Sequence, residues 1–160
     1  MKKNIAAALL LGSILIFKAE ASVISFFVVE TGLPDNMGVN KHSLLWEDSF
    51  MDVFFDSGYI VSNYPMLRFN VKQEGNIQEI AGFDVFEAID ASVDFVLIAK
   101  LDYSSPIDAP DRISLYIFKV KQHEIIYERL IQGKKYGSEK DASSDIKKII
   151  KELVQFVVRL

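Results

Sequence analysis

The stretch DFVLIAKLDY, residues 94–103, decides the fold of this chain. Its first part, Phe95 to Ala99, is a near-continuous apolar run. Such a run is typical of a central strand that is covered on both faces, as in sheets with parallel strands. The stretch therefore predicts the middle of an α/β sheet.

The segments upstream predict a first β-α-β unit. Residues 23–30 are β-branched and aromatic and predict a buried strand, and residues 31–41 are rich in Gly, Pro, Asp and Asn and predict a loop. Residues 43–57 predict a helix that stops at Gly58, with aspartates at 48, 52 and 56 on its wet side. Its predicted apolar arc consists of Trp46, Phe50, Met51, Val53, Phe54 and Phe55.

The remaining segments complete an order of β-α-β-α-β-β-β-α. Two successive β-α-β units favour a mixed sheet with helices packed against it, an α/β fold with some α+β character. In the last helix an apolar stripe faces inward, and Ser138 is the expected cap. The predicted elements are strands over 59–62 and 66–71, a helix over 76–91, a hairpin over 112–121 and 124–132, and a helix over 138–158.

The N-terminus predicts export. Lys2 and Lys3 precede an apolar run over residues 5–17, and Ala19-Glu20-Ala21 supplies a cleavage pattern. The run is shorter than the roughly 20 residues that a membrane span needs. We therefore expect residues 1–21 to be a cleaved signal peptide and residues 22–160 to be a single domain, periplasmic or secreted, without stable membrane insertion.

The composition narrows the class of partner. The chain contains no cysteine, which excludes disulfides and a lipid anchor on a cysteine. Loss of the signal peptide removes three lysines and one glutamate, leaving 15 basic and 21 acidic residues and a net charge of about −6. An acidic domain is a poor binder of nucleic acid and of anionic lipid surfaces.

Three segments resemble a group of small α/β bacterial envelope domains. ASVDFVLI at 91–98 is similar to the helix end and following strand of those domains, residues 112–126 resemble their hairpin, and an amphipathic C-terminal helix follows. The group includes the TolB N-terminal domain, CsgG and LpoB. The turn at 121–124 departs from their pattern because it lacks a glycine. We also expect this protein to lack the lipid anchor and the partner domain that they often carry. The resemblance implies a non-enzymatic role in envelope assembly, secretion or cell-wall synthesis.

No catalytic or metal-binding motif stands out. The chain has two histidines, His42 and His123, both in predicted loop or turn positions, and it has no G-x-S-x-G motif. Asp102, Asp108 and Asp111 surround a loop whose spacing matches no calcium-binding loop. We therefore expect no enzyme activity, no metal and no cofactor.

Strand ends offer the best candidates for a binding site. Ligands in open α/β sheets tend to bind beyond the carboxyl ends of parallel strands. That edge is expected to collect Glu30 with Thr31, Ser62 with Asn63, and Asp102 with Tyr103. Glu47 is a further candidate, because the helical wheel places it inside the apolar arc, where pairing with a group such as Arg68 is expected. The predicted binding residues are Glu30, Asn63, Asp102 and Glu47.

Three functions remain open. The leading interpretation is a periplasmic binding or scaffolding module that contacts envelope proteins. The alternative is a glycan hydrolase using two of Glu30, Glu47 and Asp102, which requires carboxyls roughly 5–10 Å apart in a cleft. The third is a structural domain that packs into a homo-oligomer, which exposed aromatic side chains on the first helix would favour.

Overall fold

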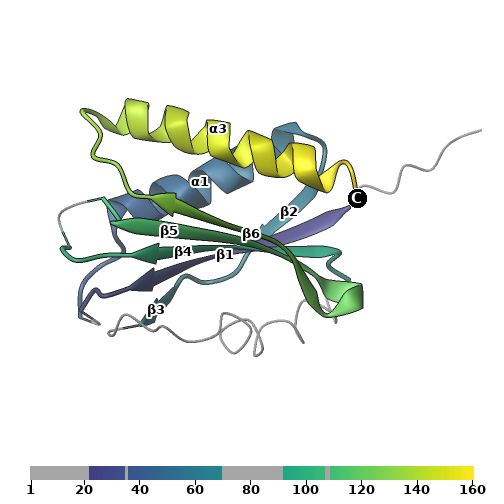
Figure 1. Cartoon of the computed structure of the whole chain (residues 1–160), viewed down its shortest axis with the longest axis horizontal. Helices are drawn as coiled ribbons and strands as arrows, with labels where there is room; N and C mark the ends of the chain where they lie inside the picture. The colour runs from purple at the N-terminus through teal and green to yellow at the C-terminus, as the bar shows by residue number, and fades with distance from the viewer. Residues whose placement is uncertain (1–21, 35, 70–91, 107–108) are drawn as a thin grey trace, which may run out of the picture.

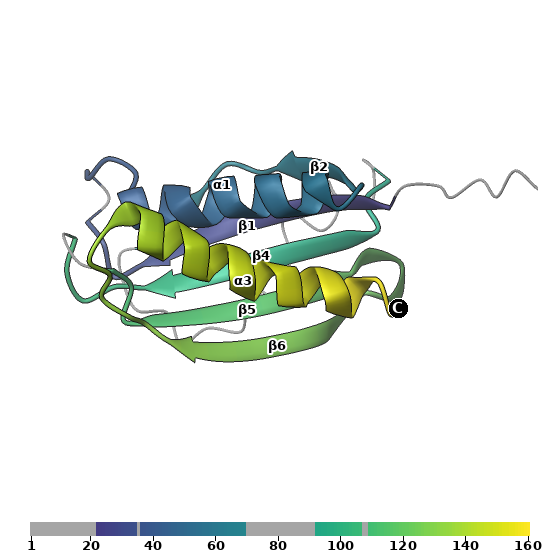
Figure 2. The same ribbon diagram turned by 90° about the horizontal axis from the view of Figure 1, so that it is seen from above.

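The computed structural model describes residues 22–34, 36–69, 92–106 and 109–160. Within these ranges, one six-stranded mixed sheet carries two helices on the same face (Figures 1 and 2). The predicted α/β class is confirmed. The helix predicted over residues 76–91 and the signal peptide predicted over residues 1–21 lie outside the described residues.

The sheet is built around the first strand. Its order is β2-β1-β4-β5-β6, and β3 also pairs with β1. β1 is parallel to β2, β3 and β4, whereas β5 is antiparallel to both of its neighbours, β4 and β6. The strands are β1 (Val23–Thr31), β2 (Ile60–Asn63), β3 (Leu67–Phe69), β4 (Phe95–Asp102), β5 (Arg112–Lys119) and β6 (Glu124–Gln132).

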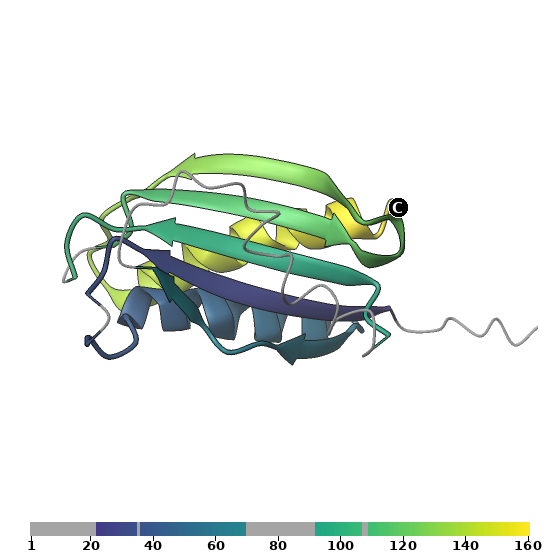
Figure 3. The same ribbon diagram turned by 90° about the horizontal axis from the view of Figure 1, so that it is seen from below.

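The predicted central strand forms β4, and every residue of β4 is buried. Figure 3, which views the sheet from the face that the helices do not cover, shows β4 between β1 and β5. A strand in this position needs apolar side chains on both faces, which explains why its sequence is a continuous run rather than an alternation.

Side-chain caps set where both helices begin. α1 (Lys41–Asp56) starts after Asn40, whose side chain accepts a hydrogen bond of 2.9 Å from the His42 N–H. It therefore begins two residues before the predicted start, and it ends before Gly58, which has the expected positive φ of 86°. α3 (Glu139–Val157) is capped as predicted by Ser138, which accepts from the Asp141 N–H at 3.2 Å.

The two faces of the sheet bury separate apolar clusters. On the helix face, Phe26 of β1 stacks on Phe50 of α1 with ring centroids 5.3 Å apart, and Ile150 of α3 is fully buried in the same cluster. On the other face, Phe27 and Val96 belong to a smaller cluster. Full burial of one such side chain contributes about 1.5–3 kcal/mol to folding, so the helix-face cluster is the main source of stability.

The predicted apolar arc of the first helix was too broad. Met51 and Phe55 are 36% and 71% exposed, whereas Trp46, Phe50, Val53 and Phe54 are buried as expected. α1 buries only the arc that faces the sheet, and its two large outward side chains are left in solvent.

None of the helices in the described part of the chain is long and apolar enough to cross a membrane.

In the connection between β5 and β6, a histidine takes the left-handed conformation for which a glycine was expected. A short 3-10 helix, η1 (Val120–Gln122), follows β5, and His123 then adopts the left-handed conformation with φ 54° and ψ 39°. This conformation is uncommon outside glycine, but histidine is among the residues that adopt it more often. The predicted hairpin therefore forms without the glycine of the related domains.

Candidate functional site

The carboxyl ends of β1 and β4 meet as the sequence predicted. Thr31 is paired with Asp102 and Glu30 with Leu101. Residues paired in register point to the same face of a sheet, and neighbours along a strand point to opposite faces. The Glu30 side chain is therefore on the helix face and the Asp102 side chain on the other face, so these two carboxylates do not share a cleft.

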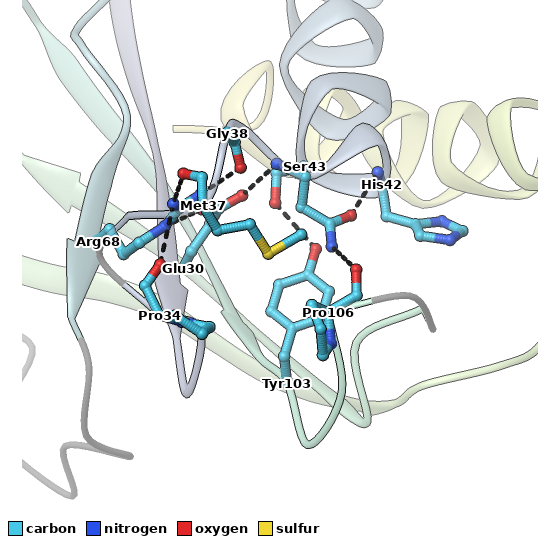
Figure 4. A network of polar contacts seen from close by, with 10 residues as sticks. Glu30, Pro34, Met37, Gly38, His42, Ser43, Arg68, Tyr103 and Pro106 are labelled. Atoms are coloured by element: carbon cyan, nitrogen blue, oxygen red, sulfur yellow. Dashed lines mark hydrogen bonds and ion pairs between the residues drawn. The ribbon is translucent and has the colours of Figure 1, made fainter.

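Glu30 is fully buried and is held by three donors. The Arg68 Nε donates to Glu30 Oε2 at 2.7 Å, a second guanidinium nitrogen donates to the same oxygen, and the Asn40 backbone N–H donates to Oε1 at 3.1 Å (Figure 4). The arginine comes from β3, which pairs with β1 so that Arg68 lies opposite Glu30. The carboxylate thus joins two strands to the start of α1.

The same guanidinium holds the loop between β1 and α1. Arg68 donates to the carbonyl oxygens of Met37 and Gly38, the latter at 3.0 Å, and lies 3.4 Å from that of Pro34 (Figure 4). An open hollow of about 230 Å³ lies beside this ion pair and is lined by Glu30, Met37, Val39, Met66 and Arg68. The ion pair therefore connects β1 and β3 to the loop that leads into α1.

Two further bonds tie the end of β4 to α1. The Tyr103 and Ser43 hydroxyls are 2.8 Å apart, and the Asn40 Nδ2 donates to the Pro106 carbonyl at 3.0 Å (Figure 4). Burial raises the pKa of Tyr103 well above its ordinary value, and the bond to Ser43 only partly offsets this. Tyr103 is therefore a neutral hydroxyl that fixes the helix against the sheet.

Asp102 is the centre of a second polar cluster on the other face. It accepts from the Thr31 hydroxyl at 2.6 Å and from Arg112 Nε at 2.7 Å, and Lys100 Nζ lies 3.4 Å away. Burial alone would raise the pKa of Asp102, but the bonds from Thr31 and Arg112 and the charges of Lys100 and Arg112 outweigh it and lower the pKa below its ordinary value. A general acid needs the opposite shift.

Asn63 does not join this edge. β2 pairs with the first half of β1, which places Asn63 beside Phe26 rather than beside Glu30. The exposed Asn63 amide instead donates a hydrogen bond to Glu47 on α1. Glu47 is thus paired, as expected, but with Asn63 and not with the suggested Arg68, which binds Glu30.

These contacts decide what the carboxylates can do. Glu30 and Asp102 are buried, lie on opposite faces and are each paired with an arginine, so they do not form the facing pair that a glycan hydrolase needs. In the ranges that the structure describes, no group of three or more His, Asp or Glu side chains is placed to hold a metal ion. Asp108 of the predicted loop lies outside those ranges.

The structure adds one surface that the sequence did not predict. Leu44, Met51 and Phe55 are 43%, 36% and 71% exposed, and their spacing of i, i+7 and i+11 places them within about 40° of the α1 circumference. Asp48, also exposed, lies beside them. We call these four residues the α1 outer face. Their spacing could have revealed the stripe, but the apolar arc was assigned entirely to the core.

The described residues form a small α/β domain with buried polar networks and an exposed apolar row on α1. The chain belongs to the family whose model, described as "Uncharacterised protein", matches residues 35–157. No curated protein sequence matches the chain.

Three solved structures illustrate the similarity of fold. The PelC dodecamer from Paraburkholderia phytofirmans is 12% identical with a TM-score of 0.51, over 81% of this chain and 85% of that one. TolB from Acinetobacter baumannii is 11% identical (TM-score 0.45) over 84% of this chain and 28% of its own, and the LpoB C-terminal domain from Salmonella enterica is 13% identical (TM-score 0.43) over 72% and 84%. The predicted resemblance to TolB- and LpoB-type domains is confirmed as a likeness of fold.

Proposed function

We propose that this protein is a non-enzymatic binding and scaffolding module of the cell envelope that works through protein contacts. The observation that carries the proposal is the α1 outer face, where three large apolar side chains are exposed in a row. Exposed apolar side chains gathered on one element are typical of a protein-protein contact surface. Phe55 is the strongest anchor, because aromatic side chains contribute large contact areas at interfaces.

The acidic residues beside the α1 outer face indicate the charge of the partner surface that would fit it. Asp48 and Glu47 lie on α1 next to the apolar row, and Glu47 is bonded to Asn63 of β2. The partner is therefore expected to offer apolar side chains bordered by basic ones. Of the four residues predicted for binding, we propose that Glu47 and Asn63 form the rim of this surface, whereas Glu30 and Asp102 hold the loops and strands in place.

We further propose that residues 1–21 direct export and are removed, and that residues 22–160 act in the periplasm as one domain. The apolar run and the cleavage pattern support export, and the likeness of fold to TolB and LpoB agrees with an envelope location. The PelC structure is a dodecamer, so domains of this fold occur in assemblies. A scaffolding role fits a domain whose polar networks are turned inward and whose apolar row is turned outward.

Site-specific photocrosslinking in living cells tests the proposal. A benzophenone amino acid replaces Phe55 in the full chain, and the matched control replaces Leu130, which is 65% exposed on β6. We expect an abundant protein adduct in the envelope fraction from position 55 and not from position 130. Equal labelling at both positions, or no protein adduct from position 55, would contradict a contact surface on α1.

A further inference from the structure

We propose that the hollow beside the Glu30–Arg68 ion pair is a binding site for an aromatic side chain of the partner protein. This inference rests on the proposed function, because it adds a second contact point to the surface on α1. The hollow measures about 230 Å³ and lies at the amino end of α1, where the β1–α1 loop meets β3 (Figure 4). We call it the β3 hollow, and its lining residues are Glu30, Met37, Val39, Met66 and Arg68.

The polar groups of the β3 hollow are already engaged with each other and with the loop. A guanidinium has five N–H donors, all in one plane. Two of those of Arg68 point to the Glu30 carboxylate. The other three point to backbone carbonyls of the loop, those of Pro34, Met37 and Gly38 (Figure 4). An anionic ligand would therefore meet donors that are occupied and a positive charge that Glu30 already balances.

The part of Arg68 that stays available to a ligand is the flat face of its guanidinium. Arginine stacks on aromatic rings through this face, and hydrogen bonds in the guanidinium plane leave the face open. Met37 and Met66 are half-buried and add thioethers, which make favourable contacts with aromatic rings. Val39, 53% exposed, adds an apolar rim. An aromatic ring suits all of these surfaces together.

The volume of the β3 hollow agrees with one aromatic side chain. An apolar cavity of about 150 Å³ is large enough to bind benzene, and the β3 hollow is larger at about 230 Å³. Methionine side chains are flexible and fill irregular gaps. The walls formed by Met37 and Met66 are therefore able to adjust to a phenylalanine, tyrosine or tryptophan ring.

The β3 hollow and the α1 outer face border the same edge of the sheet. Glu47 of α1 is bonded to Asn63 at the end of β2, so this side of the helix faces that edge. β3 follows β2 along the same side of β1 and places Arg68 near the amino end of α1. A protein that covers Leu44 on α1 is therefore within reach of the hollow. Aromatic side chains that fill a pocket commonly dominate the binding energy of an interface.

Nuclear magnetic resonance of the protein expressed from the full 160-residue sequence, with ¹³C-methyl-labelled methionine, tests this site. The probe is N-acetyl-tryptophanamide, and N-acetyl-leucinamide is its aliphatic counterpart. The ring current of the bound indole should shift the methyl signals of Met37 and Met66. Met51, on the α1 outer face, is an internal control whose signal should stay in place. We expect a Kd on the order of 1 mM and binding of the leucinamide about fivefold weaker.

Two exposed valines provide a matched pair of variants. Val39→Asp puts a charge on the apolar rim and should weaken binding of the tryptophanamide by about fivefold or more. Val158→Asp, at a position that is 70% exposed at the end of α3, should leave binding unchanged. Arg68→Lys keeps a cation beside Glu30 but removes the flat face, and should abolish the preference for the aromatic probe. Circular dichroism confirms that each variant is folded.

Three results would overturn the inference: methionine signals in the hollow that do not move, equal binding of the two amides, or equal effects of the two valine variants. Crosslinking in cells from a benzophenone amino acid at position 39 then tests the partner. We expect the same protein adduct as from position 55. No adduct from position 39, or an adduct to a lipid or to a different protein, would contradict the assignment of the ring to that partner.

The two proposals fail in different ways. An adduct from position 55 without binding of the tryptophanamide would refute the β3 hollow as a binding site and leave the contact surface on α1 supported. Binding of the tryptophanamide without any adduct from position 55 would refute the proposed function, while the hollow would still be shown to accept an aromatic ring.

Discussion

Glu30 on β1 and Arg68 on β3 lie opposite each other in the sheet, and the guanidinium that pairs with this fully buried carboxylate also holds the β1–α1 loop. Replacing Arg68 by leucine leaves the carboxylate buried without its cation, and we expect a loss of about 3–5 kcal/mol of unfolding free energy. Urea denaturation followed by circular dichroism measures it. Lys121→Ala removes the exposed pair with Asp94 and should cost at most about 1 kcal/mol; equal losses would contradict the structural role.

Asp102 should make stability depend on pH. Its pKa in the folded protein lies below the ordinary value of 3.8, so the unfolded chain takes up the proton first as the pH falls. The stability contributed by Asp102 is therefore fully present well above pH 3.8 and is lost as the pH falls through and below that value. Asp102→Asn should be much less stable than the wild type at pH 7, and the difference should shrink toward pH 3. A difference that stays constant from pH 7 to pH 3 would argue against the ionised carboxylate as the source.

Asn40 has two separable roles. Its Oδ1 caps α1 and its Nδ2 donates to the Pro106 carbonyl. Asn40→Ala removes both bonds and should lower the melting temperature by more than Asn40→Asp, which keeps the cap but loses the donor. The cap alone is expected to contribute about 1 kcal/mol. Calorimetry measures both variants, with Ser138→Ala, which removes the cap of α3, as a reference. If only the cap mattered, Asn40→Asp would be as stable as the wild type and only Asn40→Ala would lose stability.

Gly133 cannot accept a side chain. A Cβ at this position would lie 1.7 Å from the Pro110 carbonyl oxygen, and the Gly133 N–H donates to the Asp111 carbonyl at 2.7 Å. Because the obstacle is backbone, Gly133→Ala must displace the chain and should cost about 1–3 kcal/mol or more. Gly38→Ala meets no atom within 4 Å and is the control, expected to be neutral. Thermal unfolding of both variants decides the point.

The hydrophobic pattern predicted the positions of strands and helices in the sequence better than it predicted the register in which the strands pair. The run over 94–103 gave β4 directly, because a strand buried on both faces has no polar alternation. The stop at Gly58 and the cap at Ser138 follow from local chemistry and were also confirmed. The register between two strands depends on residues far apart in the sequence, so the pattern of one segment does not predict it. Asn63 was therefore placed at the wrong end of β1, since short β2 pairs only as far as Phe26.

The candidate site depended on this alignment. Glu30 and Asp102 were correctly brought to the ends of adjacent strands, but their opposite faces became visible only with the register. Arg68 was named as an example of a partner for Glu47, but nothing in the local sequence indicated that β3 would pair with the second half of β1 and bring Arg68 to Glu30. Phe55 was assigned to the core because hydropathy cannot show which apolar side chains of a helix have no neighbour to bury them.

The central place of β1 has a consequence for how the chain folds. β1 is the first strand to be synthesised, yet its partner on one side is β4, with Thr31 paired to Asp102, 71 residues later. Until that distant strand emerges, an almost wholly apolar segment has an unpaired edge, which invites aggregation. Contacts so far apart in sequence also slow folding, because the intervening loop must close first. The sheet around β1 therefore cannot be completed until the chain has been synthesised as far as Asp102.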